Sequence, residues 1–450
     1  MFYRIFRAFI TLCLRIYYRK IEAPHLAKVQ REGPLLLVAN HGNALLDPLL
    51  LLALLPRPLS FLAKHSLFDT PFIGFFVRRI GGLPVYRRQD APGESRRNEE
   101  TLEACGKILE RGGAVCLFPE GVSHDRPRLE TLKTGAARIF FLARTEKSRP
   151  VRVVPVGINF EAKTLFRSRV LAIFGPPVAT ADFSEGGAAS GGVESLTGRI
   201  EEALRALVPD LDSWEELEFV RGIKELHLGR STGSLAEEAP TLKRFIEGYR
   251  YYRETRPEAV QEMRARWDAY RRQMARFSVT EEQVDLAEAP VRAARFLLTS
   301  ALVIGLVLPL AAVGFVVHAV PFLLTGWVER KLNRDPDLTA TFKLLAGLLL
   351  FPLAYIIVLA FPFVRGGWRA ALPGLALLPL CGWASLLVGE NRGRLAESAR
   401  ALFLALPGGR ALEEIRRERK GILERVALLI RDLPPPETGP ARGALRGAKR

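Results

Sequence analysis

Three long apolar segments in the C-terminal half constrain the fold of this 450-residue chain more than any other feature. They cover residues 296–328, 344–364 and 370–388, and the first contains His318 as its only ionisable side chain. A helix needs about 20 mostly apolar residues to cross a bilayer, and buried helices of soluble proteins seldom run this long without a charge. The pattern predicts an integral membrane protein with a C-terminal α-helical membrane domain over residues 296–390.

The positive charge of the chain also favours a membrane environment. The sequence has 65 Lys and Arg against 48 Asp and Glu, a formal net charge of +17, together with 48% hydrophobic residues. Disordered basic tails and simple nucleic-acid binders are poor in apolar residues, and no nucleic-acid recognition motif accompanies the charge. Membrane lipids are therefore the expected anionic partner, and no nucleic-acid partner is predicted. The four cysteines are scattered without a CxxC spacing, so neither a metal site nor a disulfide framework is predicted.

Residues 1–23 carry a separate signal of membrane association. Apolar side chains recur at the spacing that places them on one face of a helix, and several arginines keep the segment positive. The apolar positions are Phe2, Ile5, Phe6, Phe9, Ile10, Cys13, Ile16 and Tyr17. The segment lacks the uninterrupted apolar centre and cleavage site of a secretory signal. The pattern predicts an interfacial helix on anionic lipid, with a helix docked on the protein's own core as the alternative.

Residues 24–183 alternate short apolar runs with helical patterns. Strands are expected over residues 35–39, 59–63, 82–86, 114–118, 151–160 and 170–174, with helices over 98–111 and 135–144. Strands that alternate with helices predict an α/β fold, a mixed sheet flanked by helices with functional groups at the strand ends.

Two further regions are less informative. Residues 193–290 are helical in pattern and highly charged, with aromatic side chains among arginines. These are Phe245, Tyr249, Tyr251, Tyr252, Trp267 and Tyr270. They could contact lipid headgroups or a partner helix, or simply form the core of a helical hairpin. Residues 391–450 are basic, and their end, rich in Pro, Gly and Arg, is predicted to be disordered.

The α/β region places a histidine and a carboxylate just beyond its first expected strand. His41 follows the strand between Asn40 and Asn43, and Asp47 comes after five intervening residues. A carboxylate on one ring nitrogen fixes the tautomer of an imidazole and raises its basicity, so the other nitrogen can take a proton from an alcohol. A catalytic pair is one interpretation, and a histidine satisfied within the core is the other.

Three further blocks lie at or near the ends of later strands. They contain Arg87 and Arg88, then Glu120, Gly121, Ser123 and His124, and finally Pro155. Arginine offers a planar fork for phosphate oxygens, and glycine lets the backbone approach a ligand closely. Taken singly, each block could equally be a set of solvated side chains, a surface ion pair or a strand-edge break.

Together and in this order, the four blocks resemble those of the glycerolipid acyltransferase family, which includes lysophosphatidate and glycerol-3-phosphate acyltransferases. The resemblance covers about residues 21–177 and implies an acyltransferase-type mixed sheet. It implies transfer of a fatty acyl group from an acyl thioester, acyl-CoA or acyl-carrier protein, to a hydroxyl of a glycerol phosphate in phospholipid biosynthesis. No metal or bound organic cofactor is implied. His41 and Asp47 would be catalytic, and the acceptor would contact Asn40, Asn43, Arg87, Arg88, Glu120, Gly121, Ser123, His124 and Pro155.

Two departures from the family pattern concern the acceptor. The spacer between His41 and Asp47 has five residues, one more than usual, which a loop before the helix could absorb. Val122, Ser123 and His124 replace the usual Thr-Arg-Ser, and this block resembles the glycerol-3-phosphate branch. Family size alone favours lysophosphatidate, so both acceptors stay open.

The residues also predict the mechanism. His41, oriented by Asp47, would remove the proton of the acceptor hydroxyl as it attacks the thioester, a role typically worth about 10²–10⁴-fold. Neither Cys116 nor Ser123 has the GxSxG setting of a covalent nucleophile. A non-enzymatic lipid scaffold or transporter that retains the domain is the alternative, although such a domain need keep neither His41 nor Asp47.

Charge positions predict how the apolar segments cross the membrane. A domain that uses acyl thioesters faces the cytosol, and the positive-inside rule places there the basic residues between the first two segments and after the third. The α/β domain and both basic stretches all lie in the cytosol if residues 296–328 form a hairpin broken near Pro309 and Gly314. A turn over residues 365–369 then joins the other two segments. A single tilted crossing by the first segment is the alternative.

Overall fold

The computed structural model describes residues 1–70, 73–86, 95–143, 149–183, 191–229, 233–277, 279–281, 284, 290–333, 338–404 and 410–434. Its contacts divide the chain into two compact units. The α/β unit comprises Met1–Leu217, Gly233–Pro240 and Asp335–Thr341, and the helical unit comprises Glu218–Thr232, Thr241–Arg334 and Phe342–Arg450.

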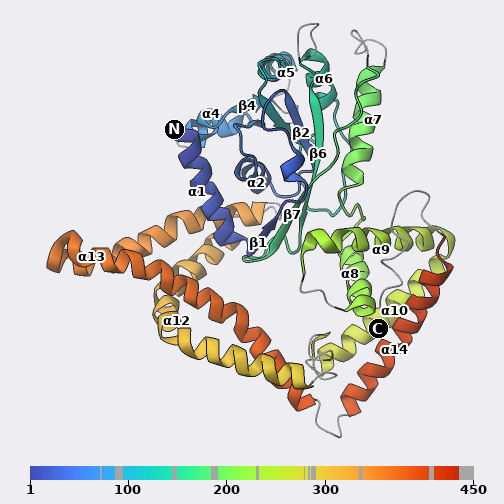
Figure 1. The fold of residues 1–450 in the computed structure, drawn as a ribbon, viewed down its shortest axis with the longest axis vertical. Coiled ribbons are helices and arrows are strands. Elements are labelled where there is room, and N and C mark those ends of the chain that lie inside the picture. The colour runs from blue at the N-terminus through green and yellow to red at the C-terminus, as the bar shows by residue number, and fades with distance from the viewer. Residues whose placement is uncertain are drawn as a thin grey trace. The chain divides into compact units, whose positions relative to one another are not determined.

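A mixed sheet forms the centre of the α/β unit, as the sequence predicts, and it has seven strands where six were expected (Figure 1). Its strands are β1 (Lys20–Glu22), β2 (Leu35–Ala39), β3 (Ser60–Lys64), β4 (Gly82–Val85), β5 (Ala114–Leu117), β6 (Arg152–Phe160) and β7 (Arg169–Phe174). Their order is β1-β7-β6-β2-β5-β3-β4, with β6 and β7 antiparallel and the other pairs parallel. Because β2 and β5 are parallel neighbours, the residues that follow them meet at one edge of the sheet. β1 was not predicted, since three residues are too few to show an alternating pattern.

Helices cover both faces of this sheet. They are α1 (Phe2–Tyr17), the short 3-10 helix Leu26–Lys28, α2 (Leu46–Leu54), α3 (Ser66–Asp69), α4 (Ile73–Arg79), α5 (Ser95–Glu110), α6 (Gly135–Leu142) and α7 (Gly192–Arg205). α5, α6 and α7 share one buried cluster with alternate residues of β2 and β5. Leu196, Ile200 and Leu204 of α7 belong to this cluster, so the composition boundary at residue 193 does not coincide with the structural one.

The N-terminal helix α1 packs on the protein's own core through part of its apolar surface. Ile10, Cys13, Leu14 and Tyr17 are buried, and the Arg7 guanidinium donates hydrogen bonds of 3.1 and 3.2 Å to a carbonyl at the end of α2. The apolar face of α1, which the sequence predicted to be continuous, is therefore divided into a buried part and an exposed part. Ile5, Phe9, Leu12 and Ile16 form a second, exposed apolar stripe. Contact of this stripe with lipid stays a prediction.

Among the described residues, the helical unit contains six long helices, three of which begin in the α/β unit. These helices are α8 (Trp214–Leu228), α9 (Leu235–Thr255), α10 (Pro257–Arg276), α12 (Pro290–Leu332), α13 (Thr339–Leu404) and α14 (Arg410–Asp432). Tyr249, Tyr252, Trp267 and Tyr270 are buried, whereas Tyr251 is exposed. Four of the aromatic residues singled out in the sequence thus form the core of a helical bundle.

Within the described residues, two helices are long and apolar enough to cross a membrane, over Leu297–Leu332 and Thr339–Asn391. Only 12% and 6% of the residues in their apolar windows are buried, whereas a core helix of a soluble protein is mostly buried. Leu302, Leu306 and Val364 are 76%, 82% and 84% exposed. An apolar surface of this kind needs an apolar solvent, so these helices indicate association with a membrane.

The expected backbone break near Pro309 and Gly314 is wrong, because α12 is one α-helix that continues through both residues. A proline inside a helix removes one hydrogen bond and can bend the helix without ending it. Gly314 serves a packing role, since a Cβ atom there would lie 2.0 Å from the Cys381 carbonyl oxygen of α13. The expected turn between the other two segments is confirmed: α13 is broken at Gly367, with φ 67° and ψ −163°.

The single ionisable side chain of the first apolar segment is fully engaged. One ring nitrogen of His318 donates to the Gly314 carbonyl oxygen at 2.7 Å, and the other accepts from the Tyr355 hydroxyl at 2.9 Å. Ser385 adds a hydrogen bond of 2.8 Å to the Ala311 carbonyl oxygen. Polar contacts of this kind hold transmembrane helices together, so His318 joins α12 to α13.

Candidate active site

His41 and Asp47 form a hydrogen-bonded pair just beyond the carboxyl end of β2. Nδ1 of His41 lies 3.0 Å from Oδ2 of Asp47, a residue of the first turn of α2 that is 0% exposed. The imidazole is 13% exposed and stacks on Phe118, with ring centroids 4.2 Å apart. A buried carboxylate keeps the Nδ1 proton in place, which leaves Nε2 as the proton acceptor. Nε2 has no hydrogen-bond partner among the residues that the structure describes.

The loop between the pair absorbs the extra spacer residue. The Asn43 backbone N–H donates to Oδ2 of Asp47 at 2.7 Å, and the Asn43 carbonyl accepts from the first backbone N–H groups of α2. Ala44 adopts a positive φ of 28°, which is uncommon for a residue with a side chain. The Asn43 amide is 0% exposed, and within the described chain neither its oxygen nor its nitrogen has a partner. A buried amide without a partner in the described chain, beside the Asp47 carboxylate, is suited to bind a ligand.

Glu120 joins the loop after β5 to the histidine. Its Oε2 accepts the backbone N–H of His41 at 3.0 Å and lies 3.0 Å from Nε2 of His124. The His124 backbone N–H in turn donates to the His41 carbonyl oxygen at 3.2 Å. Glu120 is 2% exposed, and its Oε1 has no partner in the described part of the chain. One oxygen of Glu120 therefore positions both histidines, and the other remains able to accept a ligand hydroxyl.

Two residues expected to bind substrate are engaged inside the fold. The Asn40 amide forms two hydrogen bonds with the Ile158 backbone, of 2.7 and 3.0 Å, and so joins the end of β2 to β6. Pro155 is buried within β6 opposite Val38, and its carbonyl accepts from Gly175 at 2.9 Å. Both side chains support the strands that carry the site.

The remaining expected residues lie around the same edge or outside the described chain. Gly121 has φ 73°, a left-handed conformation that favours glycine, whereas the atom nearest to an added Cβ, Nζ of Lys133 at 2.5 Å, ends a flexible side chain that can move aside. Ser123 lies in the same loop, directly before His124. Arg87 and Arg88 follow β4 but lie outside the described residues.

A buried lysine that the sequence reasoning missed anchors the loop after β5. Nζ of Lys163 donates to the His124 carbonyl oxygen at 3.2 Å and to Oδ1 of Asp125 at 3.1 Å. The Trp214 indole N–H donates to the same carboxylate oxygen at 3.3 Å. Lys163 is 7% exposed although it lies in an irregular stretch after β6, where no local pattern predicts burial.

The cysteine nearest the pair is unsuited to covalent catalysis. Cys116 lies fully buried within β5, where burial and then the Asp47 charge raise the pKa of its thiol. A thiol whose pKa is raised is rarely the reactive thiolate near neutral pH. In the part of the chain that the structure describes, no group of three or more His, Cys, Asp or Glu side chains is arranged to hold a metal ion.

Comparison with known families matches both units. The acyltransferase family model matches residues 20–159, and the model of the glycerol-3-phosphate acyltransferase 2 C-terminal domain matches residues 234–438. The first match contains all four blocks described above.

Individual relatives differ in how much of the chain they cover. An uncharacterized acyltransferase of Schizosaccharomyces pombe is 23% identical over 95% of this chain and 80% of its own length. Glycerol-3-phosphate O-acyltransferase 1 of Saccharomyces cerevisiae is 23% identical over 92% of this chain and 69% of its own length. A chloroplastic 1-acyl-sn-glycerol-3-phosphate acyltransferase of Arabidopsis thaliana is 32% identical, over 30% of this chain and 34% of its own length.

Proposed function

We propose that this chain, which belongs to the glycerolipid acyltransferase family, transfers a fatty acyl group from an acyl thioester to a hydroxyl of glycerol-3-phosphate. The observation that supports the proposal most is the His41–Asp47 pair. It offers one free imidazole nitrogen next to two ligand-binding groups without partners in the described chain, the Asn43 amide and Oε1 of Glu120. A non-enzymatic scaffold would need none of these groups.

The pair performs the transfer without a covalent enzyme intermediate. Nε2 of His41 takes the proton of the acceptor hydroxyl while the hydroxyl oxygen attacks the thioester carbonyl carbon. The new C–O bond forms, the C–S bond breaks, and the imidazolium returns its proton to the leaving thiolate. Asp47 stabilises the positive charge on the ring between these two steps. This mechanism uses no metal ion or bound organic cofactor, and the donor is either acyl-CoA or acyl-carrier protein.

Coverage of the relatives favours glycerol-3-phosphate over lysophosphatidate as the acceptor. The relative named for glycerol-3-phosphate aligns with 92% of the chain, and the C-terminal family model is named for the same acceptor. Relatives named for 1-acylglycerol-3-phosphate align with 29–48% of the chain. The match over the helical unit thus supports glycerol-3-phosphate as the acceptor.

An acceptor panel tests this proposal. Purified full-length protein in lipid nanodiscs is incubated with radiolabelled oleoyl-CoA and either glycerol-3-phosphate, 1-oleoylglycerol-3-phosphate or glycerol. We expect kcat/KM to be at least tenfold higher for glycerol-3-phosphate than for the other two acceptors. Preference for 1-oleoylglycerol-3-phosphate would move the assignment to the second acylation step, and absence of acyl transfer from both oleoyl-CoA and oleoyl-acyl-carrier protein would reject the reaction.

Replacing Glu120 with glutamine tests the roles proposed for its two carboxylate oxygens. Glu120→Gln keeps the shape of the side chain but removes the charge that accepts the His41 and His124 N–H groups. A hydrogen bond to a charged group contributes about 1.5–3 kcal/mol, so kcat/KM should fall about 10–100-fold, with a rise in KM for glycerol-3-phosphate. Glu130→Gln is the matched control, since Glu130 pairs with surface arginines in the same loop. Equal kinetics for the two variants would contradict the role of Glu120.

The membrane orientation follows from a contact on the helical unit. Helices α10 and α14 precede and follow the two apolar helices, and they pack together, with Arg425 2.9 Å from Glu262. This contact supports a common face of the membrane for both helices. We propose that this face is cytosolic, since acyl thioesters are found there. In this arrangement α13 enters and returns around Gly367, and α12 is embedded without a net crossing.

Cysteine labelling tests the orientation. Single cysteines replace Lys420 in α14, Arg365 at the α13 turn and Arg126 in the α/β unit, all exposed, in a variant without the four native cysteines. In sealed vesicles, an impermeant maleimide should label Lys420→Cys and Arg126→Cys from the same side and Arg365→Cys from the opposite side. Labelling of Lys420→Cys and Arg126→Cys from opposite sides would contradict the shared face.

A further inference from the structure

The position of His41 depends on the loop after β5. Glu120 accepts the His41 backbone N–H at 3.0 Å, and its same oxygen lies 3.0 Å from Nε2 of His124. The His124 backbone N–H donates to the His41 carbonyl oxygen at 3.2 Å. Two buried atoms of this loop, Oε1 of Glu120 and Nδ1 of His124, have no partner in the described chain. A shift of the loop would therefore move His41 and both of these atoms together.

A buried cation holds the end of this loop. Nζ of Lys163 donates to the His124 carbonyl oxygen at 3.2 Å and to Oδ1 of Asp125 at 3.1 Å. Lys163 is buried although it belongs to the irregular stretch between β6 and β7. A charged group is rarely buried unless it is paired, so these two oxygens tie the stretch after β6 to the loop after β5.

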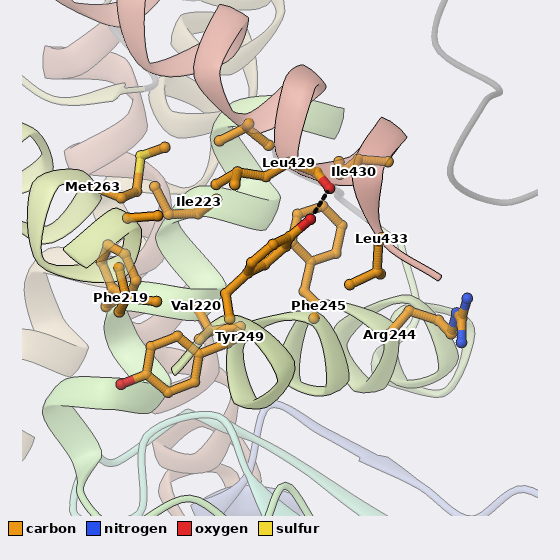
Figure 2. Close-up of a pocket in the computed structure, with 15 residues that line it drawn as sticks. Phe219, Val220, Ile223, Arg244, Phe245, Tyr249, Met263, Leu429, Ile430 and Leu433 are labelled. Atoms are coloured by element: carbon orange, nitrogen blue, oxygen red, sulfur yellow. Dashed lines mark hydrogen bonds between the residues drawn. The ribbon is translucent and has the colours of Figure 1, made fainter. Parts of the chain in front are cut away.

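The indole of Trp214 contacts the same carboxylate from a third segment. Its N–H donates at 3.3 Å to the Asp125 oxygen that also accepts from Lys163. Trp214 begins α8 and belongs to the α/β unit. The later turns of α8 serve packing instead, since Phe219 and Ile223 line an apolar pocket of the helical unit (Figure 2). Oδ1 of Asp125 is thus an acceptor shared by two residues from distant parts of the chain.

We propose that Lys163 is a positioning residue that fixes the loop after β5 and, through Glu120, the backbone of His41. Its ammonium acts on the reaction through the His124 carbonyl rather than by contact with the reacting atoms. Misplacement of a catalytic group by about 1 Å can cost about 10²-fold in rate, so a residue that fixes this loop affects acyl transfer. The kinetic test rests on the proposed function, whereas the position of the loop can be measured without any reaction.

Removal of the ammonium tests the kinetic role. Lys163→Met keeps an unbranched side chain and should lower kcat/KM for glycerol-3-phosphate about tenfold. Arg57→Met is the matched control, because the Arg57 guanidinium donates at 2.8 and 2.6 Å to the Gly33 and Gly112 carbonyl oxygens. These two glycines precede β2 and β5, at the opposite edge of the sheet. The control should therefore stay within about twofold of the wild-type kcat/KM.

A double-variant cycle separates positioning from general destabilisation. Because Lys163 would act through Glu120, Lys163→Met should add no more than about a twofold loss to that of Glu120→Gln. Effects that are independent of each other multiply instead, so the double variant would then lose about a further tenfold. Such a multiplied loss would overturn the proposal.

Hydrogen exchange measures the loop without any substrate. Full-length protein in nanodiscs is exchanged into heavy water, and its peptides are analysed by mass spectrometry. Lys163→Met should speed exchange about tenfold in the peptides that contain the His41 and His124 backbone amides, both of which donate within the site. Arg57→Met should leave these two peptides unchanged.

A milder variant covers the case in which Lys163→Met does not fold, as judged by its melting temperature. Trp214→Phe removes one donor to Asp125 and should change kcat/KM and the exchange rates by about threefold. Wild-type exchange at the His41 and His124 amides in a folded variant of either kind would overturn the proposal. If the wild-type protein transfers no acyl group, the proposed function fails, and the exchange rates alone decide whether Lys163 fixes the loop.

Discussion

Replacing His41 with alanine should lower kcat/KM for acyl transfer to glycerol-3-phosphate by about 10³–10⁴-fold, because the variant lacks the imidazole nitrogen that takes the proton of the attacking hydroxyl in the proposed mechanism. Oε1 of Glu120 and the Asn43 amide would still bind the acceptor, so its KM should change much less than kcat. The measurement is steady-state acyl transfer by purified protein in nanodiscs, with oleoyl-CoA as the donor.

Controls separate this effect from misfolding. The His41 ring stacks on Phe118, so His41→Ala also removes packing, whereas His41→Gln retains most of the volume. Both variants should be equally inactive, with melting temperatures near that of the wild type. His227→Ala, in the helical unit, should retain full activity. A folded His41 variant with more than a tenth of the wild-type kcat/KM would exclude His41 as the base.

The sequence predicted the sheet well because its strands are short buried runs separated by turn residues. The run over residues 35–39 became β2 with the expected bounds, and all five of its residues are buried. Since parallel strands end at a common edge, the positions of His41 and Glu120 could also be anticipated. The pattern could not reveal that the two residues are joined by a hydrogen bond, which depends on the register between β2 and β5.

The roles of single site residues were less predictable, because a polar side chain at a strand end can face a ligand or another strand. Asn40 joins β2 to β6, a contact across 118 positions of sequence that no local pattern encodes. Lys163 is equally non-local: it is buried because its ammonium reaches the loop of His124 and Asp125. Burial of charged residues follows from such tertiary partners, which composition does not contain.

The amphipathic N-terminal segment shows a related limit of what a sequence pattern can predict. A helical spacing of apolar residues predicts a helix with an apolar face, but it does not say what covers that face. In α1, Ile10 and Leu14 are buried against the fold while Phe9 and Leu12 remain exposed. The buried residues confirm docking on the protein's own core, and binding of the exposed residues to lipid stays a prediction. The membrane segments were clearer, since their length and lack of charge leave few other environments.

Changing Asp47 to asparagine should lower kcat by about 10²–10³-fold, a smaller loss than that of His41→Ala, because the base remains but loses the group that orients it. Oδ2 of Asp47 accepts from both Nδ1 of His41 and the Asn43 backbone N–H. An amide at this position carries no negative charge to stabilise the imidazolium. Its NH₂ group can also donate to Nδ1, which places the ring proton on Nε2 and removes the base.

The split between kinetic constants distinguishes this role from a structural one. Asp47→Asn should leave KM for glycerol-3-phosphate within about threefold of wild type, since Asp47 is fully buried and touches the acceptor only through His41. Asp69→Asn, an exposed aspartate in α3, is the matched control and should be fully active. If Asp47→Asn retained the wild-type kcat with the loop intact, His41 would act without its carboxylate. If KM rose instead, Asp47 would serve the acceptor-binding loop through Asn43, and the orientation of the imidazole would have to come from its stacking on Phe118.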